Sequence, residues 1–188
     1  MTRLDRRSFV GLLALLTTVP ASAATSPSLN YMQQAAKDLL HANRQGTVAS
    51  FRRAIVRHAD LENIATYSLG QYKTKLKETQ RDRYYDGVAT FMARYFADQS
   101  REYRVAKYEL GEPRAEGEKD VKIASKVFLL TGKVYTVTWY LSWRGGRYRL
   151  SDVKVLGFSL VYLQRNLFTS FIAKKNGDVS QLVAALNR

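Results

Sequence analysis

The sequence contains few of the residue groupings that perform nucleophilic, acid–base or metal chemistry. The sequence contains no cysteine, and neither of its two histidines, His41 and His58, is followed by a second histidine or cysteine at helical spacing. Zinc sites and activated nucleophiles need clusters of such residues. A loop that contains glycine and proline carries four acidic residues, which indicates a solvent-exposed hairpin tip: Glu112, Glu116, Glu118 and Asp120. We therefore expect no metal and no cofactor.

The segment from Gly157 to Leu160 partly resembles the glycine-containing turn that carries a nucleophilic serine in hydrolases, but it lacks two features of that turn. The turn has no second glycine, and no histidine follows it along the chain. Ser159 is better explained as the N-cap of a helix. Asp152 is a carboxylate flanked by strand residues, and it is the best candidate for a general base. An enzyme that uses Asp152 in this way is a weaker alternative to a protein without catalytic activity.

Helical periodicity dominates the first half of the chain. Apolar residues recur every three or four positions over 29–43, after Thr47, from Asp60 to Leu69, and over 77–102. Thr47 and Asp60 are suited to cap their helices. One side of the longest helix is unusually aromatic, with apolar residues at these positions: Tyr84, Val88, Phe91, Met92, Tyr95 and Phe96.

Strand periodicity replaces helical periodicity after residue 101. Segments 103–110, 121–130, 134–143 and 148–155 alternate with period two, and two short glycine turns join the last three of them. A helix should then follow from Ser159, and Asp178 should cap a last helix over 179–186. This order predicts an α+β domain: a curved antiparallel sheet of about four strands, with N-terminal and C-terminal helices packed on its concave face.

The third predicted strand is apolar on both faces. Tyr135, Val137, Trp139, Leu141 and Trp143 alternate on one face, while Val134 and Tyr140 lie on the other with two threonines. A simple two-layer domain should have one apolar and one polar face. The residues alone leave two explanations open: an ordinary core, or an apolar pocket between the sheet and the helices.

The first residues of the chain are typical of an export signal. Basic residues precede an apolar run over 9–19 that is too short to span a bilayer, and Ala21, Ser22 and Ala23 suit a signal peptidase. The arginine pair also resembles a twin-arginine export motif. We predict a signal peptide over 1–23, cleaved after Ala23, and one domain of 188 − 23 = 165 residues over 24–188.

The chain is strongly basic, with a formal net charge of +14, of which the predicted signal carries 3 − 1 = +2. A mature protein of +12 would be attracted to anionic surfaces such as nucleic acid, acidic proteins or anionic lipid headgroups. Export disfavours nucleic acid as a partner. A nucleic-acid module would also need its cations and tyrosines on one exposed face, with binding that weakens steeply with salt.

Two segments resemble the MlaC (toluene-tolerance) family of periplasmic phospholipid-binding proteins. The stronger match covers the last predicted strand and the helix after it, at Tyr148, Leu150, Asp152, Val153, Val155, Gly157, Phe158, Ser159, Arg165 and Phe168. The second consists of the Leu-Gly-x-Tyr turn at 69–72 and the helix start at Thr79. Two positions depart from the family pattern, since Lys73 replaces a usual tryptophan and Leu156 a usual glutamate.

The resemblance implies a cone of the NTF2-like or cystatin-like kind and a periplasmic lipid carrier that is not an enzyme. It implies three contacts: an inner-membrane ABC lipid transporter, an outer-membrane lipoprotein/porin complex, and transiently an anionic membrane surface. The carrier would maintain outer-membrane asymmetry, with acyl chains buried and the headgroup at the mouth. Another apolar ligand, such as a hopanoid, is an alternative within the same fold.

Burial of each CH₂ group stabilises by about 0.8 kcal/mol, so an acyl chain needs an apolar enclosure to cross water. We expect the following residues to line that enclosure: Ile64, Tyr67, Phe91, Tyr95, Val127, Leu129, Val137, Trp139, Leu141, Val153, Val155 and Phe171.

Overall fold

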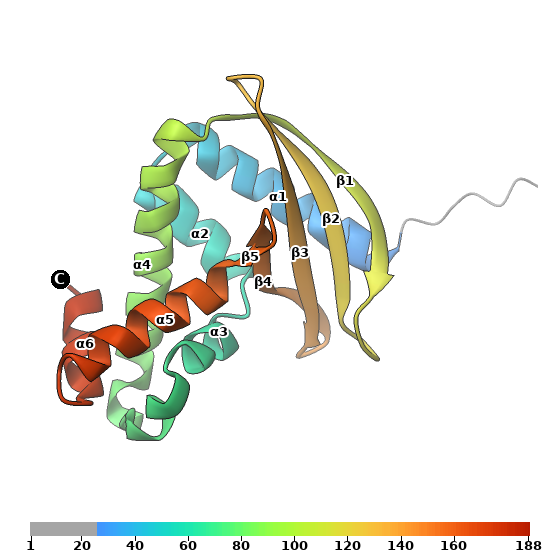
Figure 1. The fold of residues 1–188 in the computed structure, drawn as a ribbon. Helices are drawn as coiled ribbons and strands as arrows, with labels where there is room; N and C mark the ends of the chain where they lie inside the picture. The colour runs from blue at the N-terminus through green and yellow to red at the C-terminus, as the bar shows by residue number, and fades with distance from the viewer. Residues whose placement is uncertain (1–25) are drawn as a thin grey trace, which may run out of the picture.

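The computed structural model describes residues 26–188, and the predicted signal peptide over 1–23 lies outside them (Figure 1). Within the described part of the chain, no helix is both long and apolar enough to cross a membrane. The helices are α1 (Pro27–Gln45), α2 (Val48–His58), α3 (Leu61–Ser68), α4 (Arg81–Glu102), α5 (Leu160–Ala173) and α6 (Val179–Leu186), with 3₁₀ turns η1 (Gly70–Lys75) and η2 (Glu78–Gln80). The strands are β1 (Val105–Ala115), β2 (Val121–Leu129), β3 (Val134–Arg144), β4 (Arg147–Val155) and β5 (Phe158–Ser159).

Side-chain caps set the starts of four helices. Ser26, Thr47, Ser159 and Asp178 each accept a hydrogen bond from a backbone amide in the first turn of α1, α2, α5 and α6. The caps predicted at Thr47, Ser159 and Asp178 are therefore present. Asp60 precedes α3 as expected, but its side chain makes no cap bond and instead accepts from Asn63 Nδ2 at 2.8 Å.

The strands form one antiparallel sheet in the order β1-β2-β3-β4-β5, each paired with its neighbour in sequence. The sequence predicted about four strands and missed β5, a two-residue strand that is too short to show periodicity. It also placed 111–119 in a loop, whereas β1 continues to Ala115 after an irregularity between Leu110 and Pro113. An edge strand tolerates Pro113 because its outer side needs no ladder hydrogen bond. The acidic hairpin tip follows, and there Glu116 pairs with Lys122.

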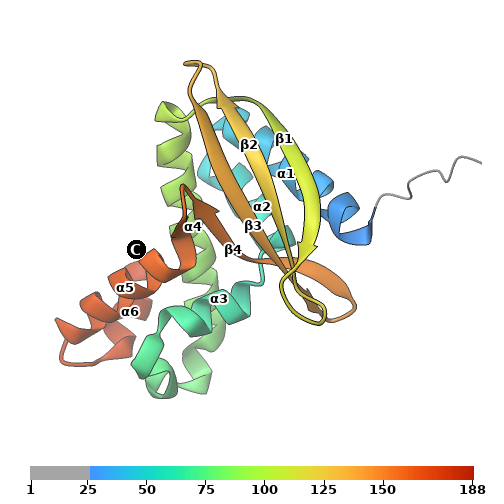
Figure 2. The same cartoon turned by 45° about the vertical axis from the view of Figure 1, so that its right-hand side comes forward.

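The sheet curves, and α1 crosses its concave side (Figures 1 and 2). At this contact Met32 and Ala35 of α1 pack with Ile123, Leu141 and Leu150 of the sheet. Helices α2 and α4 pack on each other farther from the sheet, where Phe51, Ala54 and Ala93 are among the buried residues.

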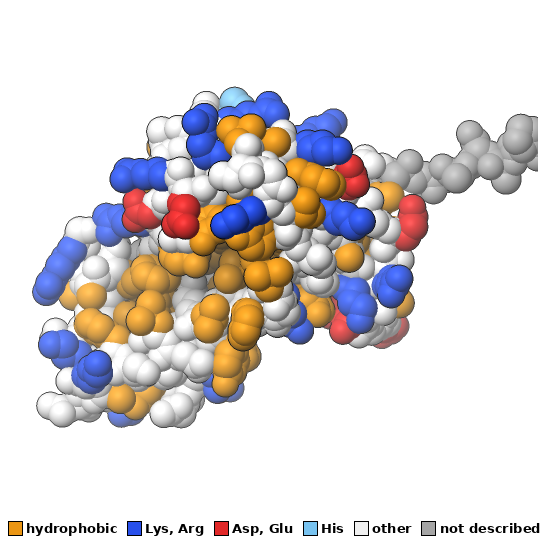
Figure 3. All heavy atoms as spheres, turned by 45° about the horizontal axis from the view of Figure 1, so that its top comes forward, with side chains coloured by type: hydrophobic (Ala, Val, Ile, Leu, Met, Phe, Trp, Pro, Cys, Tyr) orange, Lys and Arg blue, Asp and Glu red, His pale blue; other side chains and the backbone are white. Residues whose placement is uncertain are grey.

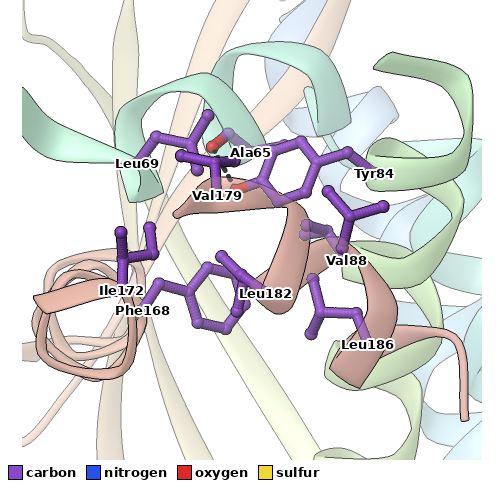
Figure 4. Close-up of a cluster of buried hydrophobic side chains, with 10 residues drawn as sticks. Ala65, Leu69, Tyr84, Val88, Phe168, Ile172, Val179, Leu182 and Leu186 are labelled. Carbon is purple, nitrogen blue, oxygen red and sulfur yellow. Dashed lines mark hydrogen bonds between the residues drawn. The ribbon is translucent and has the colours of Figure 1, made fainter. Parts of the chain in front are cut away.

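A second core, formed by helices alone, lies at the other end of the molecule. It joins α3, α4, α5 and α6 around Tyr84, Val88, Phe168 and Leu182 (Figure 4). The Tyr84 hydroxyl donates to the Ala65 carbonyl at 2.8 Å, and burial raises the pKa of this tyrosine. This cluster anchors α5 at a distance from the sheet, so the N-terminal half of α5 is free to face a cavity.

Candidate lipid-binding pocket

A cavity of about 680 Å³ lies between the sheet and the helices. Pockets for small molecules commonly measure about 300–1,000 Å³, so this one is large enough for a lipid-sized ligand. Nine of the twelve residues predicted to line a pocket do line it: Ile64, Phe91, Tyr95, Val127, Leu129, Val137, Trp139, Val153 and Val155. On each of β2, β3 and β4 these residues alternate along one face, and α3 and α4 supply the opposite wall.

The other three predicted residues lie outside the cavity. Leu141 shares a strand face with Val137 but is 1% exposed beneath α1, because that helix covers the far end of the sheet. Tyr67 is 44% exposed, with the Arg165 guanidinium 4.7 Å from its ring centroid. Phe171 packs on the helical core and borders a separate cavity of about 230 Å³.

Helices α1 and α2 also contribute to the lining, which was not predicted from the sequence. Ala36 and Leu39 of α1 and Phe51 and Ile55 of α2 all face the cavity. Their helical periodicity was visible, but an apolar stripe looks the same whether it packs against a strand or borders an empty volume. Tyr108 of β1 lines the cavity as well.

Several polar side chains of the wall have partners within the protein. Trp139 donates from Nε1 to Ser125 Oγ at 2.9 Å, and Ser125 donates to the Val137 carbonyl at 3.2 Å. Asn43 donates to the Tyr103 carbonyl and accepts from the Val105 amide. Because these groups are already hydrogen-bonded, the wall offers a ligand mainly apolar contact.

Asp152 lines the cavity, but its carboxylate binds the backbone. Oδ1 accepts from the amides of Val153 at 2.7 Å and Val161 at 3.2 Å, and Val161 is in the first turn of α5. Ser159 Oγ accepts from the amide of Tyr162 at 3.0 Å in the same turn. A carboxylate at a helix N-terminus also interacts favourably with the helix dipole. This geometry makes Asp152 a clamp between β4 and α5.

The two segments that resemble the MlaC family contact each other. Gly70 has φ +56°, and a Cβ at this position would lie 2.8 Å from Thr169 Cγ2 and 3.3 Å from Arg165 Nε. Arg165 also lies over the Tyr67 ring. The turn after α3 and helix α5 therefore approach so closely that a side chain at position 70 would force one of them to shift. Together they hold the α5 wall of the cavity in place.

A polar pair borders the cavity, and its histidine, His58, is part of the cavity wall. His58 is 3% exposed, and its Nε2 lies 2.8 Å from Asp38 Oδ2. Burial opposes ionisation of Asp38, but hydrogen bonding to His58 and the charges of His58 and Arg57 lower the pKa of Asp38 overall. Tyr31 donates to the His58 carbonyl at 2.8 Å, and burial raises the pKa of Tyr31 to about 12. Tyr31 is therefore neutral at physiological pH.

The cavity opens to solvent at the ends of β3 and β4 and along α5. Leu156, Leu163 and Leu167 line it and are themselves about half exposed or more. Figure 3 shows hydrophobic side chains gathered on this side of the molecule, with Lys and Arg side chains among them.

Over the described residues, no group of three histidine, cysteine or acidic side chains could hold a metal ion. The pocket can bury an apolar ligand, which would enter through the open mouth.

Comparisons with known proteins agree with this architecture. The fold is similar to that of a phospholipid-binding protein from Ralstonia solanacearum whose structure was solved in complex with a phospholipid, with a TM-score of 0.71 and 19% sequence identity. The match covers 87% of this chain and 97% of that chain. Among proteins of curated function, none matches this sequence significantly. Residues 24–188 match the family described as MlaC protein, and the chain therefore belongs to the MlaC family.

Proposed function

We propose that this protein is a phospholipid carrier that encloses acyl chains in the cavity between its sheet and its helices. The observation that carries the proposal is an apolar cavity of about 680 Å³ with an open, apolar mouth. Without a ligand, the apolar wall around this volume lacks packing partners or meets water, and either state costs free energy. A bound acyl chain removes this cost and in return is itself shielded from water.

The ligand is proposed to be a phospholipid because the Ralstonia solanacearum protein of similar fold holds one. The cavity would enclose the acyl chains, and the charged headgroup would remain at the mouth, where water and basic side chains can solvate it. This arrangement places few demands on headgroup identity.

The carrier would work in the periplasm after removal of residues 1–23, as the sequence of the first residues suggests. It would pass phospholipid between an outer-membrane complex and an inner-membrane ABC transporter and so maintain outer-membrane asymmetry. This part of the proposal rests on membership of the MlaC family.

Native mass spectrometry of the protein purified without detergent, followed by organic extraction, tests the proposal. We expect an added mass that matches one or more phospholipids. A hopanoid or another apolar molecule in the extract would support a carrier function with a different ligand. Protein that carries no lipid, and takes none up from phospholipid vesicles, would refute it.

Asp152 provides the test of the enzymatic alternative. The Asp152→Asn variant should keep its bound lipid, because the amide oxygen can still accept from the α5 backbone. Loss of a turnover activity with lipid binding intact would instead favour catalysis.

A further inference from the structure

The mouth of the cavity is surrounded by exposed apolar and aromatic side chains. Phe158 is 68% exposed, and Leu130, Leu156, Tyr162 and Leu167 are each more than half exposed. These residues come from the β2–β3 turn, the β4–β5 turn, β5 and α5. Soluble proteins rarely expose apolar side chains in contiguous groups unless the patch has a binding partner. We call these residues, with Tyr95 of α4 and Tyr103 immediately after α4, the rim.

The β4–β5 turn presents part of the rim in a strained conformation. Leu156 has φ +51°, which is uncommon for a residue other than glycine, and Gly157 has φ +88°. The Leu156 amide donates to the Thr136 carbonyl at 3.1 Å, so the turn is tied to β3. Leu156 lines the cavity and Phe158 does not. Strain of this kind tends to occur at functional sites.

Positive charge is concentrated in the elements that carry most of the rim. Residues 121–177, which include β2 to β5 and α5, contain ten Lys and Arg residues and one acidic residue, Asp152, a net charge of 10 − 1 = +9. The Asp152 carboxylate is already bound to backbone amides. The acidic residues near the rim are Asp98 and Glu102, on the last turns of α4.

Two exposed cationic residues, Arg104 and Lys133, lie next to the rim. The Leu130 amide donates to the Arg104 carbonyl at 2.9 Å, and the Leu129 amide donates to the Lys133 carbonyl at 2.9 Å. Arg104 and Lys133 therefore flank the β2–β3 turn, next to Leu130 and Val134. An apolar rim with adjacent cations matches an anionic bilayer, whose charged headgroups lie above its acyl region.

We propose that the rim docks directly on anionic phospholipid bilayers, with Phe158 inserted among the lipids and the cavity open to the acyl region. The inference rests on the proposed function, since a carrier's mouth has to meet the source of its acyl chains. Three rim tyrosines, Tyr95, Tyr103 and Tyr162, fit this occupant because their rings prefer the boundary between water and acyl chains. Docking in this orientation lets a lipid slide into the cavity without crossing water.

Co-sedimentation of lipid-loaded protein with vesicles tests the apolar part of the surface. The vesicles contain either phosphatidylcholine alone or phosphatidylcholine mixed with phosphatidylglycerol. We expect binding to the mixed vesicles and at least about tenfold weaker binding by Phe158→Ser, from the burial of one phenylalanine. The matched control is Val56→Ser on α2, because Val56 is 47% exposed and does not line the cavity. It should bind like the unmodified protein.

The charged part is tested by the double variant Arg104→Ala and Lys133→Ala. Each cation removed should weaken binding to the mixed vesicles by about fivefold. The control removes the same charge from exposed positions away from the rim, Lys37 on α1 and Arg83 on α4. A control that weakens binding as much as the rim variant would show diffuse attraction by net charge and overturn the proposal.

Bound lipid is measured in every variant by organic extraction, so docking and cargo binding are scored separately. Variants that retain lipid but lose vesicle binding support the docking surface. Unmodified protein that holds lipid yet binds no anionic vesicle refutes this inference and leaves the carrier intact, and the rim would then be assigned to a protein partner. Protein that carries no lipid and takes none up from the vesicles refutes the proposed function itself.

Discussion

Replacing Val137 by Trp should fill part of the cavity and compete with the ligand. Val137 lies in the middle of β3, is almost fully buried and lines the cavity. The larger side chain occupies on the order of 80 Å³ more, which at about 24 cal/mol per Å³ corresponds to about 2 kcal/mol of recovered packing. We therefore expect the lipid-free variant to be more stable than the lipid-free parent by about 2 kcal/mol, and to hold less lipid.

Urea unfolding of extracted, lipid-free protein measures the stability, and phosphate analysis of organic extracts measures the bound lipid. The matched control is Thr136→Trp, at the neighbouring exposed position, which does not line the cavity. The control should leave the lipid content unchanged. If Val137→Trp keeps a full lipid complement and is destabilised by several kcal/mol, there is no free volume at this position and the reasoning is refuted.

Three further predictions follow from contacts around the pocket. Asp152→Ala should lower the free energy of unfolding by about 1–3 kcal/mol, and Asp152→Asn by less, because only the alanine variant removes the acceptor for the α5 amides; equal losses by denaturant unfolding would contradict the clamp. Gly70→Ala should cost more than Gly132→Ala, by about 1–3 kcal/mol, since both have positive φ but only Gly70 faces α5 within 3 Å; equal costs would show that α5 can move away freely. The pKa of Asp38 is lowered in the folded protein, so the stability that its ionised form provides is present above its unfolded pKa of about 3.8 and is lost as pH falls through the folded value. The free energies of unfolding of the parent and of Asp38→Asn should therefore converge as the pH is lowered from 6 to 3. If the two curves of free energy against pH run parallel instead, the contact between Asp38 and His58 makes no such contribution.

Much of the local structure could be predicted from the sequence, because local chemistry determines it. The caps at Thr47, Ser159 and Asp178 are side chains of the right type immediately before an apolar helical pattern, and each makes the expected bond. The antiparallel order of the sheet followed from short glycine turns. The edge strand was predicted less well, because its continuation through Pro113 depends on the free side of β1.

The family could also be inferred from the sequence, but the role of its residues could not. Asp152 stood out as a carboxylate among strand residues, which allowed a catalytic interpretation. Its bond to the Val161 amide, nine residues away, exists only once α5 has turned back over the sheet. The roles of Gly70 and Arg165 likewise depend on a close contact between segments that are far apart in the sequence.

The pocket shows the same division. Alternation along β3 determined that Val137, Trp139 and Leu141 share a face, and periodicity cannot say more, since a side chain that borders a cavity and one that packs under a helix are equally apolar. Tertiary structure decided that α1 covers Leu141 while Val137 and Trp139 border the open volume. The physical reason is that a cavity is the space left between packed elements. The size and position of this space depend on how the helices pack, and those helices are anchored by contacts elsewhere in the fold.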